Sequence, residues 1–551
     1  MERLAVIRNW FVFLVAFSFF VVFFKAFDYS VLSADGTNSA TSLISVFVNS
    51  FNNLHAHKPN HSLDVPQMFN QNASPDPLVD TDNPFIDVIE SLDHANNLAV
   101  NKNTTLAART KRPADSCEGR YIYVHHLPRR FNDDVLKNCS VLVKWLDMCP
   151  FLTNLGFGPQ VENSEGVLSE KSWFTTNQFL LEVIFHERMK KYKCLTNDSS
   201  FANAIYVPFY AGLDAGRYLW GYNISMRDSL GSDLVKWLAQ QPEWKRMWGR
   251  DHFFVLGRIG WDFRRQTDHD SDWGSKLMTL PESMNLTALS IETTSWSNEF
   301  AIPYPTYFHP SSDDEVFQWQ NRMQSHNRRY LFAFAGAPRP SANDSIRKEI
   351  IHQCLASRRT CNFLRCNSGG ESRCDNPAEV IKVFQDSVFC LQPPGDSYSR
   401  RSIFDSILAG CIPVFFHPFS AYAQYTWHLQ RDYWRYSVFI PIDLVKDGFV
   451  SIKQVLLQIS ENEMLAMREE VIKLIPRVIY ADPRSKLQTL EDAFDITLKG
   501  VLHRIGKVRK NINKGRDPSN VFAEENSWKM KLSGIGVEEE WDHFTDTSMR
   551  Y

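Results

Sequence analysis

The fold is decided by SVFCLQPPGDSYSRRSIFDSILAGCIPVFF, residues 387–416. The first part, Ser387–Gln392, is a short apolar run that ends at two prolines and a glycine, Gly395. Such a pattern is typical of a buried strand closed by a loop. Ile412–Phe416 is a second apolar run of the same kind, and it predicts a second strand.

Between these two runs the sequence predicts a helix. Apolar residues recur at helical spacing over 403–408, Ser397 or Ser399 can cap the start, and Gly410 fits a left-handed C-terminal cap. Strand, tight loop, helix and strand form a βαβ unit of a parallel sheet. Because such sheets bind ligands at the carboxyl ends of their strands, we expect the loop 393–400 to face a ligand.

Two arginines at the start of this helix point to the kind of ligand. Arg400 and Arg401 lie where the helix dipole disfavours cations. An anion would remove the conflict, since backbone N–H groups, guanidinium groups and serine hydroxyls can together hold a pyrophosphate. Asp405, one turn further on, could accept hydrogen bonds from a ribose. The alternative is an exposed Arg401–Asp405 ion pair at i,i+4 spacing, with no ligand.

Length and composition describe a large globular chain. Its 551 residues allow two substantial domains, and the net charge of −3 gives no basis for a nucleic-acid partner. All 10 cysteines lie within 117–411, and an even number fits disulfides in an oxidising compartment. A zinc site at Cys361, Cys366 and Cys374 is the competing interpretation.

The N-terminal segment predicts a membrane anchor. Residues 10–27 are almost all apolar, and no small-residue cleavage site follows promptly, which favours an uncleaved anchor over a signal peptide. Basic residues in the tail 1–9 keep that tail in the cytosol and place the rest of the chain in a lumen. Residues 28–116 are polar and rich in asparagine, so we interpret them as a flexible stem.

Two α/β domains are expected after the stem. In 117–325, strands at 204–207 and 253–256 alternate with an amphipathic helix at 177–190, which predicts a parallel sheet. The proline-rich and aromatic stretch 298–325 is expected to cross to the next domain.

A second α/β pattern starts at Tyr330 and turns at Gly336, and a helix that carries Arg347 follows. It continues to a helix over 487–505 whose apolar residues share one face. The second domain is therefore predicted to span 326–510, and residues 511–551 form a polar tail.

Two polar clusters of the first domain invite a metal interpretation. Asp268–Asp272 contains overlapping Asp-x-Asp patterns, which can hold a divalent metal beside a diphosphate, although a polar turn explains them equally simply. His125 and His126 are neighbours at the end of a strand, so they point to opposite faces and are poor partners for one ligand. We expect no metal site.

Five motifs resemble one known family. They are IPYPTYFHP (302–310), FAFAGAPRP (332–340), FCLQPPGDSYSRRSIFDSILAGCIPVFF (389–416), SAYAQYTWHL (420–429) and YADPRSKL (480–487). Together they closely resemble the plant exostosin-like proteins of glycosyltransferase family 47, above all the xyloglucan galactosyltransferase group. The resemblance covers roughly residues 117–510.

The resemblance implies a GT-B fold, in which two Rossmann-like domains face a cleft. It implies a nucleotide sugar in the C-terminal domain, the acceptor mainly in the N-terminal domain, inversion at the anomeric carbon, and no metal cofactor. The family motif maps onto Arg400, Arg401 and Asp405, in agreement with the interpretation from charge and spacing. The predicted donor-binding residues are Gly336, Arg347, Gly395, Ser397, Ser399, Arg400, Arg401 and Asp405.

The catalytic base is not assigned by the resemblance, because His126 stands where related chains often carry an acid. Inverting transfer needs a base that deprotonates the acceptor hydroxyl. Asp214 and Asp262 each follow a predicted strand of the first domain and are the leading candidates, with Glu292 third. The first domain is also rich in tryptophan and tyrosine; most belong to the core, but a few exposed rings could stack on sugars.

The expected function is that of a single-pass type II Golgi membrane enzyme with a lumenal catalytic domain. It would move galactose from UDP-galactose in β linkage to xylosyl side chains of xyloglucan in the plant cell wall, with other Golgi transferases as further partners. Two alternatives remain. One is transfer of another UDP-sugar, such as galacturonic acid or arabinose, to a wall glycan, and the other is a non-catalytic partner in a Golgi complex. The presence of Arg400, Arg401 and Asp405 favours an enzyme.

Overall fold

The computed structural model describes residues 115–162, 166–294, 296–339, 345–366 and 372–518. They belong to one compact unit that begins at Asp115. The predicted anchor at 10–27, almost all of the predicted stem and most of the predicted polar tail lie outside the described residues. Within the described part of the chain, no helix is both long enough and apolar enough to cross a membrane.

The first sheet is entirely parallel, with strand order β1-β2-β3-β4-β5. Its side chains are buried along β2, β3, β4 and β5, as expected when helices and loops cover both faces of a parallel sheet. Its strands are β1 (Ile122–Val124), β2 (Ala204–Tyr206), β3 (His252–Val255), β4 (Thr287–Ser290) and β5 (Glu299–Ala301).

The second sheet is also parallel, with strand order β10-β9-β8-β6-β7. Its strands are β6 (Tyr330–Gly336), β7 (Cys361–Arg365), β8 (Ser387–Gln392), β9 (Ile412–Phe415) and β10 (Val438–Phe439). The direction of winding reverses between β6 and β8, and the crevice at such a switch point is the usual ligand site of this class of sheet. The predicted α/β fold with parallel sheets is confirmed.

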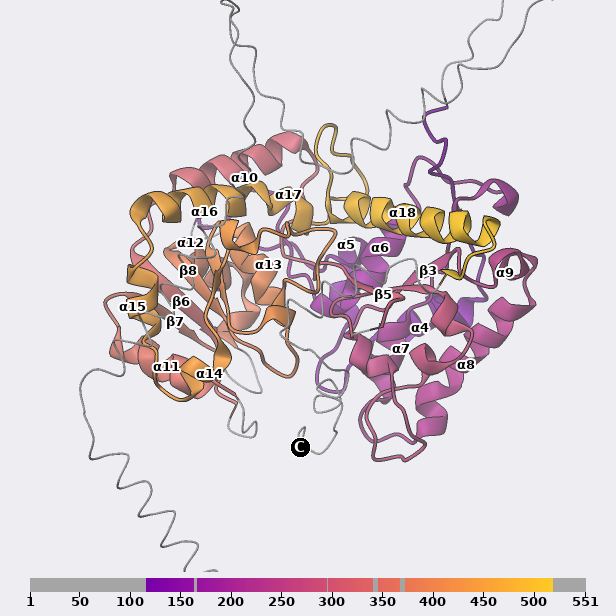
Figure 1. The fold of residues 1–551 in the computed structure, drawn as a ribbon, viewed down its shortest axis with the longest axis horizontal. Coiled ribbons are helices and arrows are strands. Elements are labelled where there is room, and N and C mark those ends of the chain that lie inside the picture. Colours follow the sequence, from indigo (N-terminus) through magenta and orange to yellow (C-terminus); the bar gives the residue numbers. More distant parts are fainter. Residues whose placement is uncertain (1–114, 163–165, 295, 340–344, 367–371, 519–551) are drawn as a thin grey trace, which may run out of the picture. The chain divides into compact units, whose positions relative to one another are not determined.

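Helices connect and cover the strands (Figure 1). Those around the first sheet are α4 (Asp133–Lys137), α5 (Thr153–Gly156), α6 (Leu181–Met189), α7 (Ala211–Tyr218), α8 (Ile224–Gln240) and α9 (Pro242–Met247). Those around the second are α10 (Asp313–Ser325), α11 (Arg347–Ala356), α12 (Pro377–Gln385), α13 (Arg401–Leu408), α14 (Ile442–Lys446), α15 (Ile452–Leu457), α16 (Glu461–Lys473) and α17 (Ile475–Val478). The last is α18 (Ala493–Asn513).

The predicted βαβ unit is present as β8, α13 and β9, and Phe389 of β8 pairs with Ile412 of β9. Gly410 has a φ of +60°, so the predicted left-handed C-terminal cap is confirmed. The predicted serine N-cap is wrong. Arg400 occupies the N-cap position without a side-chain capping bond, because the Ser399 hydroxyl donates to Glu292 instead.

The helix predicted over 177–190 forms as α6, but it is not amphipathic, since almost all of its side chains are buried. It packs against β3 and against Phe494 of α18. Its buried polar groups have partners inside the protein. Glu182 accepts hydrogen bonds from the backbone N–H groups of Gly212 and Leu213 in the first turn of α7.

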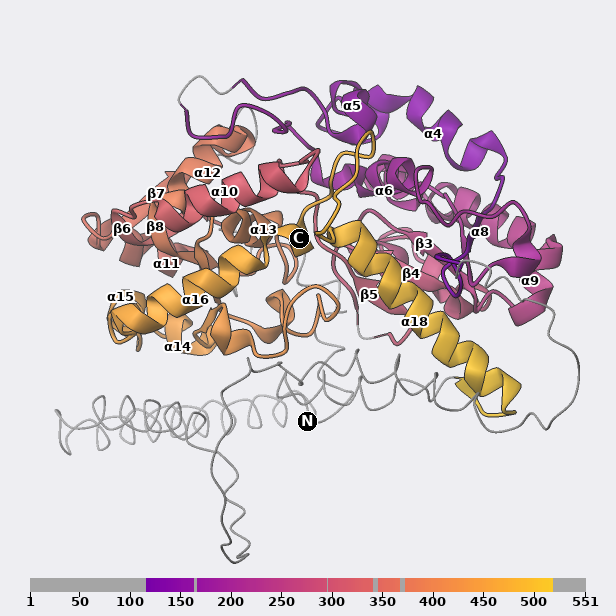
Figure 2. The ribbon, with the colours of Figure 1, turned by 90° about the horizontal axis from the view of Figure 1, so that it is seen from above.

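Two helices, α10 and α18, make contacts with residues of both halves of the chain. Trp319 of α10 donates from its indole nitrogen to the Leu408 carbonyl at 2.8 Å, while its ring lies 4.7 Å from that of Trp173. Helix α18 follows elements of the second sheet in sequence but lies along the first sheet in two views (Figures 1 and 2). Arg509 of this helix donates to the carbonyl of Asn203 at 3.0 Å. The sequence assigned this helix to the domain 326–510. Its start contacts His428 of the second half, and the helix also contacts β2 of the first sheet.

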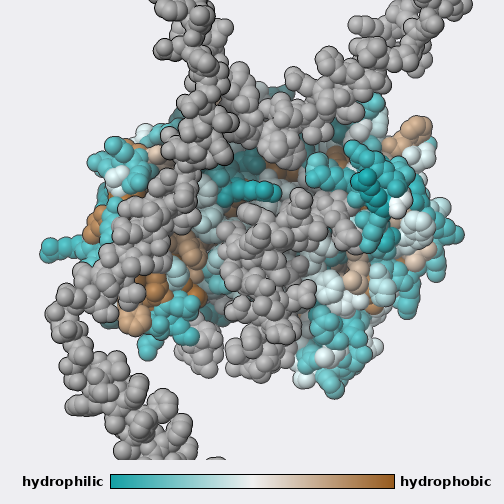
Figure 3. Space-filling view, viewed as in Figure 1, coloured by the Kyte–Doolittle hydropathy of each residue, from teal (hydrophilic) through white to brown (hydrophobic). Residues whose placement is uncertain are grey.

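Disulfides account for all ten cysteines, so the disulfide prediction is confirmed and the zinc interpretation is wrong. The pairs are Cys117–Cys194, Cys139–Cys149, Cys354–Cys361, Cys366–Cys374 and Cys390–Cys411. The last pair links β8 to the residue before β9, and so ties the βαβ unit together. Where Figure 3 shows described residues, hydrophilic side chains predominate and hydrophobic ones form small patches.

Candidate active site

The loops after β6 and β8 meet at the switch point of the second sheet, and Arg347 joins them. This residue begins α11, and its Nε donates to the Pro394 carbonyl at 3.0 Å. Its Nη1 donates to the Ala337 carbonyl at 3.4 Å. Burial lowers the pKa of Arg347 to about 9, and the nearby charges of Arg400 and Arg339 act in the same direction.

Arg400 is only partly exposed, at 24% of its side chain, and it has few partners. A Cβ on Gly395 would fall on the Arg400 guanidinium, so only glycine allows this close approach. Its only ion pair within the described residues is with Asp396, at 3.9 Å from Nη1. Nε and Nη2 of Arg400 are buried and have no hydrogen-bond partner in the described structure. Buried donors of this kind are normally satisfied, so these two call for an acceptor.

Positive charge exceeds negative charge around this loop. Arg339, Arg347 and Arg400 surround residues 393–400. Among the described residues, the carboxylate in their ion pairs is that of Asp396, which lies 2.7 Å from Arg339 and 3.9 Å from Arg400. Three guanidinium groups at the carboxyl end of a parallel sheet suit an anion with several oxygens, such as a diphosphate. Gly336 ends β6 at the same edge of the sheet.

Arg401 is bound differently from its neighbour. Its Nη1 donates to the Thr176 carbonyl at 2.6 Å, and its guanidinium lies 3.7 Å from the centre of the Tyr307 ring. Its Nε lies 3.4 Å from Asp405 Oδ2, so the i,i+4 pair suggested by the sequence exists but is buried rather than exposed. Arg401 thus has protein partners on three sides, and its part in donor binding stays a prediction.

Asp405 is buried beside Arg401. Burial raises its pKa to about 6, while the Arg401 charge lowers it in part. Its Oδ1 has no hydrogen-bond partner within the described chain. The predicted contact to a ribose is not tested by these contacts, but they leave one carboxylate oxygen available.

Glu292 joins the two sheets at this point. It follows β4 closely, and its Oε2 accepts hydrogen bonds from the backbone N–H of Ser399 at 2.6 Å and from the Ser399 hydroxyl at 2.5 Å. The backbone N–H of Tyr398 donates to Oε1 at 3.4 Å. Burial raises the pKa of Glu292, and the hydrogen bonds from Ser399 and Ser397 and the Arg400 charge oppose that rise. Of the three predicted bases, Glu292 is the one that contacts the loop 393–400.

Asp262 has other partners. Its Oδ2 accepts from Arg258 Nε at 2.6 Å, and its Oδ1 accepts from the indole N–H of Trp273 at 2.7 Å. Both oxygens are therefore engaged in the first half of the protein. A role of Asp262 as base stays a prediction.

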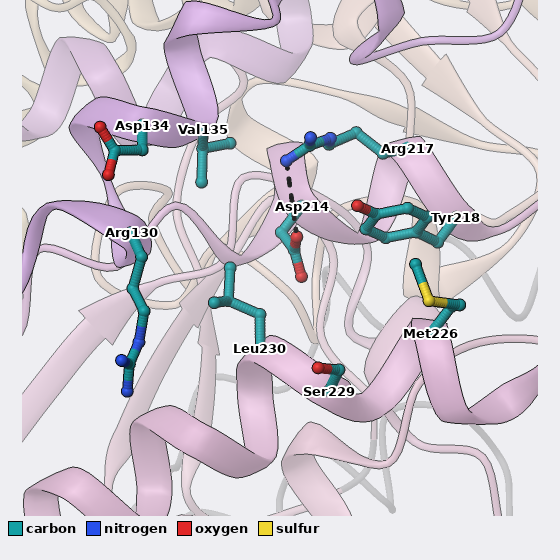
Figure 4. A pocket seen from close by; sticks show the side chains of 9 residues that line it. All are labelled: Arg130, Asp134, Val135, Asp214, Arg217, Tyr218, Met226, Ser229 and Leu230. Atoms are coloured by element: carbon teal, nitrogen blue, oxygen red, sulfur yellow. Dashed lines mark ion pairs between the residues drawn. The ribbon is translucent and has the colours of Figure 1, made fainter.

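Asp214 lies in a separate cavity of about 280 Å³ (Figure 4). Burial raises its pKa to about 7, and Arg217, whose Nη1 lies 4.0 Å from Oδ1, lowers it in part. Figure 4 shows side chains of α4, α7 and α8 around this cavity. The cavity lining contains no residue of the loop 393–400. A role of Asp214 as base stays a prediction.

The Asp268–Asp272 segment makes the contacts of a polar turn. Asp268 forms an ion pair with Lys276 at 2.5 Å, and Asp270 accepts from the first backbone N–H of α8, that of Ile224, at 2.8 Å. No group of three or more potential metal ligands is gathered in the part of the chain that the structure describes.

Three residues at the junction of the sheets were not predicted from the sequence. The Tyr304 hydroxyl lies 3.2 Å from the Ser399 hydroxyl. Gln424 Oε1 accepts from the Thr293 backbone N–H at 2.7 Å, and the Tyr425 hydroxyl donates to the Ile291 carbonyl at 2.7 Å. All three residues lie in the motifs 302–310 and 420–429. The sequence therefore marked the segments that contain these residues, but it did not show which residues they contact.

Comparison with known proteins agrees with these motifs. The model of the exostosin GT47 domain matches residues 116–456. Xyloglucan galactosyltransferase MUR3 of Arabidopsis thaliana is 56% identical over 79% of this chain and 70% of its own. The probable xyloglucan galactosyltransferase GT12 of that plant is 56% identical over 76% of this chain and 83% of its own.

A third relative differs in the sugar that its name specifies. Xyloglucan-specific galacturonosyltransferase 1, also of Arabidopsis thaliana, is 45% identical over 72% of this chain and 59% of its own. The family match covers more than half of the chain, and the resemblance found in the motifs is confirmed. The chain therefore belongs to the exostosin GT47 family and is a glycosyltransferase.

Proposed function

We propose that this enzyme transfers galactose from UDP-galactose in β linkage to xylosyl side chains of xyloglucan. The observation that carries the proposal is the group of Arg347 and Arg400 at the switch point of the second sheet, with Glu292 of the first half in contact with the same loop. The sugar and the acceptor are supported by the names of relatives that are 56% identical to this chain.

The charges suggest how the reaction proceeds. Arg347 and Arg400 bind the diphosphate, and Asp405 accepts a hydrogen bond from the ribose. The acceptor hydroxyl oxygen attacks the anomeric carbon from the face opposite the diphosphate, and its proton passes to Glu292. As the new C–O bond forms, the bond to the diphosphate oxygen breaks and UDP leaves with the electron pair. The arginines stabilise the charge that develops on UDP, so no metal is required.

The proposal includes a GT-B arrangement of the two sheets and a location in the Golgi membrane. Two parallel sheets whose carboxyl ends share one site correspond to a GT-B enzyme, with donor binding on the second sheet and acceptor binding on the first. Residues 10–27 anchor the enzyme in the Golgi membrane as a type II protein with a lumenal catalytic domain. Protease added to sealed microsomes should then spare the catalytic domain, and its digestion would reject this topology.

Galacturonic acid is the second candidate for the transferred sugar, because one relative with 45% identity is named as a galacturonosyltransferase. The two donors differ by a carboxylate on the sugar. A direct comparison therefore separates them.

The purified enzyme should be given UDP-galactose, UDP-galacturonic acid and UDP-arabinose in turn with xyloglucan oligosaccharides that lack galactose. We expect a mass increase of one hexose with UDP-galactose alone, and the same rate in the presence of EDTA. Transfer of a uronic acid would replace the proposed donor. Loss of activity in EDTA with recovery on Mn²⁺ would show that the arginines do not suffice for the diphosphate.

A further inference from the structure

Three tryptophans of the first half form a row at the protein surface. The rings of Trp145 and Trp220 are 4.6 Å apart at an interplanar angle of 77°, and those of Trp220 and Trp273 are 5.2 Å apart at 73°. Trp145 is 62% exposed. We call Trp145, Trp220 and Trp273 the tryptophan row.

The exposed end of the row is held in place by a closed loop. The disulfide Cys139–Cys149 spans the loop that carries Trp145, and Val143 and Leu146 pair across its tip. Leu142, Val143 and Met148 anchor the loop in the core. Because the loop is anchored, the Trp145 ring is held in a fixed position at the surface. Exposed apolar surface of this kind is typical of binding sites.

The inner end of the row leads to the candidate active site. The Trp273 indole donates to Asp262, which also binds Arg258, and the Arg258 guanidinium lies 5.7 Å from the centre of the Trp220 ring. The segment 258–262, which holds Arg258 and Asp262, pairs with Glu292: the Gly260 backbone N–H donates to the Glu292 carbonyl at 2.8 Å. One hydrogen-bonded segment therefore connects the tryptophan row to the proposed base.

We propose that the tryptophan row binds the β-glucan backbone of the acceptor, with the exposed Trp145 ring stacked on a glucose unit. The inference rests on the proposed function for the nature of the acceptor. Pyranose rings present C–H groups on their faces and hydroxyls at their edges, so a rigid aromatic ring matches a face while water solvates the edges. A second contact on the backbone, away from the transferred sugar, positions a long acceptor and adds affinity that a short one lacks.

The test measures binding without catalysis. Wild-type enzyme, Trp145→Ala and Trp145→Phe should be titrated with galactose-free xyloglucan polymer by calorimetry, with no donor present. We expect Trp145→Ala to weaken binding at least about tenfold and Trp145→Phe to restore most of it, because a phenyl ring still stacks. Unsubstituted cello-oligosaccharides should compete for the site in the wild type. Trp434→Ala is the matched control, since Trp434 is 47% exposed but belongs to the second half.

The outcomes separate this inference from the proposed function. Equal polymer affinity in wild type and Trp145→Ala, or no binding by the wild type, would overturn the tryptophan row as an acceptor site, whatever the transfer assay shows. Loss of binding in Trp434→Ala to the same extent would also overturn it. Weakened binding in Trp145→Ala, combined with transfer of a sugar other than galactose, would uphold the row and reject the proposed donor.

Discussion

Glu292→Gln should lower turnover by about 10²–10⁴-fold, because an amide cannot take the proton of the acceptor hydroxyl. The substitution keeps the shape of a side chain that is buried between the two sheets. Since burial raises the pKa of Glu292, the wild-type rate should fall with decreasing pH at a higher pH than for an ordinary glutamate. The variant should lose this dependence. Turnover and its pH profile, measured at saturating acceptor and donor, check both expectations.

Glu315→Gln is the matched control for this loss. Glu315 accepts from the hydroxyls of Ser172 and Ser311 at 2.6 Å each and from the Ser311 backbone N–H at 3.0 Å, a pattern like that of Glu292. It lies in α10 and makes none of the contacts to the loop 393–400. Its replacement should change turnover less than about tenfold. Near-normal turnover in Glu292→Gln would remove Glu292 as the base and return attention to Asp214.

Arg401→Ala should lower the free energy of unfolding by about 3–5 kcal/mol, since removing one member of a buried ion pair leaves the other charge unpaired. The substitution leaves Asp405 without its cation and the Thr176 carbonyl without its donor, and it removes the packing on Tyr307. Urea unfolding of the purified enzyme measures the change.

Two further variants show whether the cause is the buried charge. In the double variant Arg401→Ala, Asp405→Ala part of the stability should return, because no unpaired carboxylate remains. Arg129→Ala removes an exposed pair with the same i,i+4 spacing, to Asp133, and should cost far less. A small loss in Arg401→Ala would contradict the structural role given to this arginine.

The sequence located the donor-side loop because the pattern was local. Strand, proline turn, helix and Gly410 all lie within 387–416, and each has its own signal of period, capping or chain reversal. The prediction of a serine N-cap was wrong because of a contact between residues far apart in the sequence. Ser399 is bound by Glu292, which is 107 positions away in sequence.

Long-range partners also separated two arginines that look equivalent in sequence. Arg400 and Arg401 are neighbours at one helix start, yet Arg401 reaches Thr176, 225 positions earlier, while two nitrogens of Arg400 have no partner in the described structure. The same limit applies to α6. Its polar residues suggested a solvent-facing side, but Glu182 turns inward to bind the start of α7.

For helix α18, the sequence predicted the helix but not the surfaces that it contacts. Its apolar face was visible in the sequence, but the surface that this face covers was not, because amphipathic period gives no partner. The same holds for two residues of the candidate site, Tyr304 and Gln424. The sequence motifs contain both residues, but only the structure shows that Tyr304 contacts Ser399 and that Gln424 contacts Thr293.

The central claim is that Arg400 is kept for the diphosphate while Arg401 holds the fold. It is tested most directly by thermal unfolding of wild type, Arg400→Ala and Arg401→Ala with and without saturating UDP. Without UDP, Arg400→Ala should unfold close to the wild-type midpoint, because the ion pair that Arg400 makes within the described residues is a distant one, to Asp396 at 3.9 Å. With UDP, its stabilisation should be smaller than that of the wild type by about 1.5–3 kcal/mol, the value of one lost charge-assisted contact. An undiminished UDP-induced shift in Arg400→Ala would contradict the account.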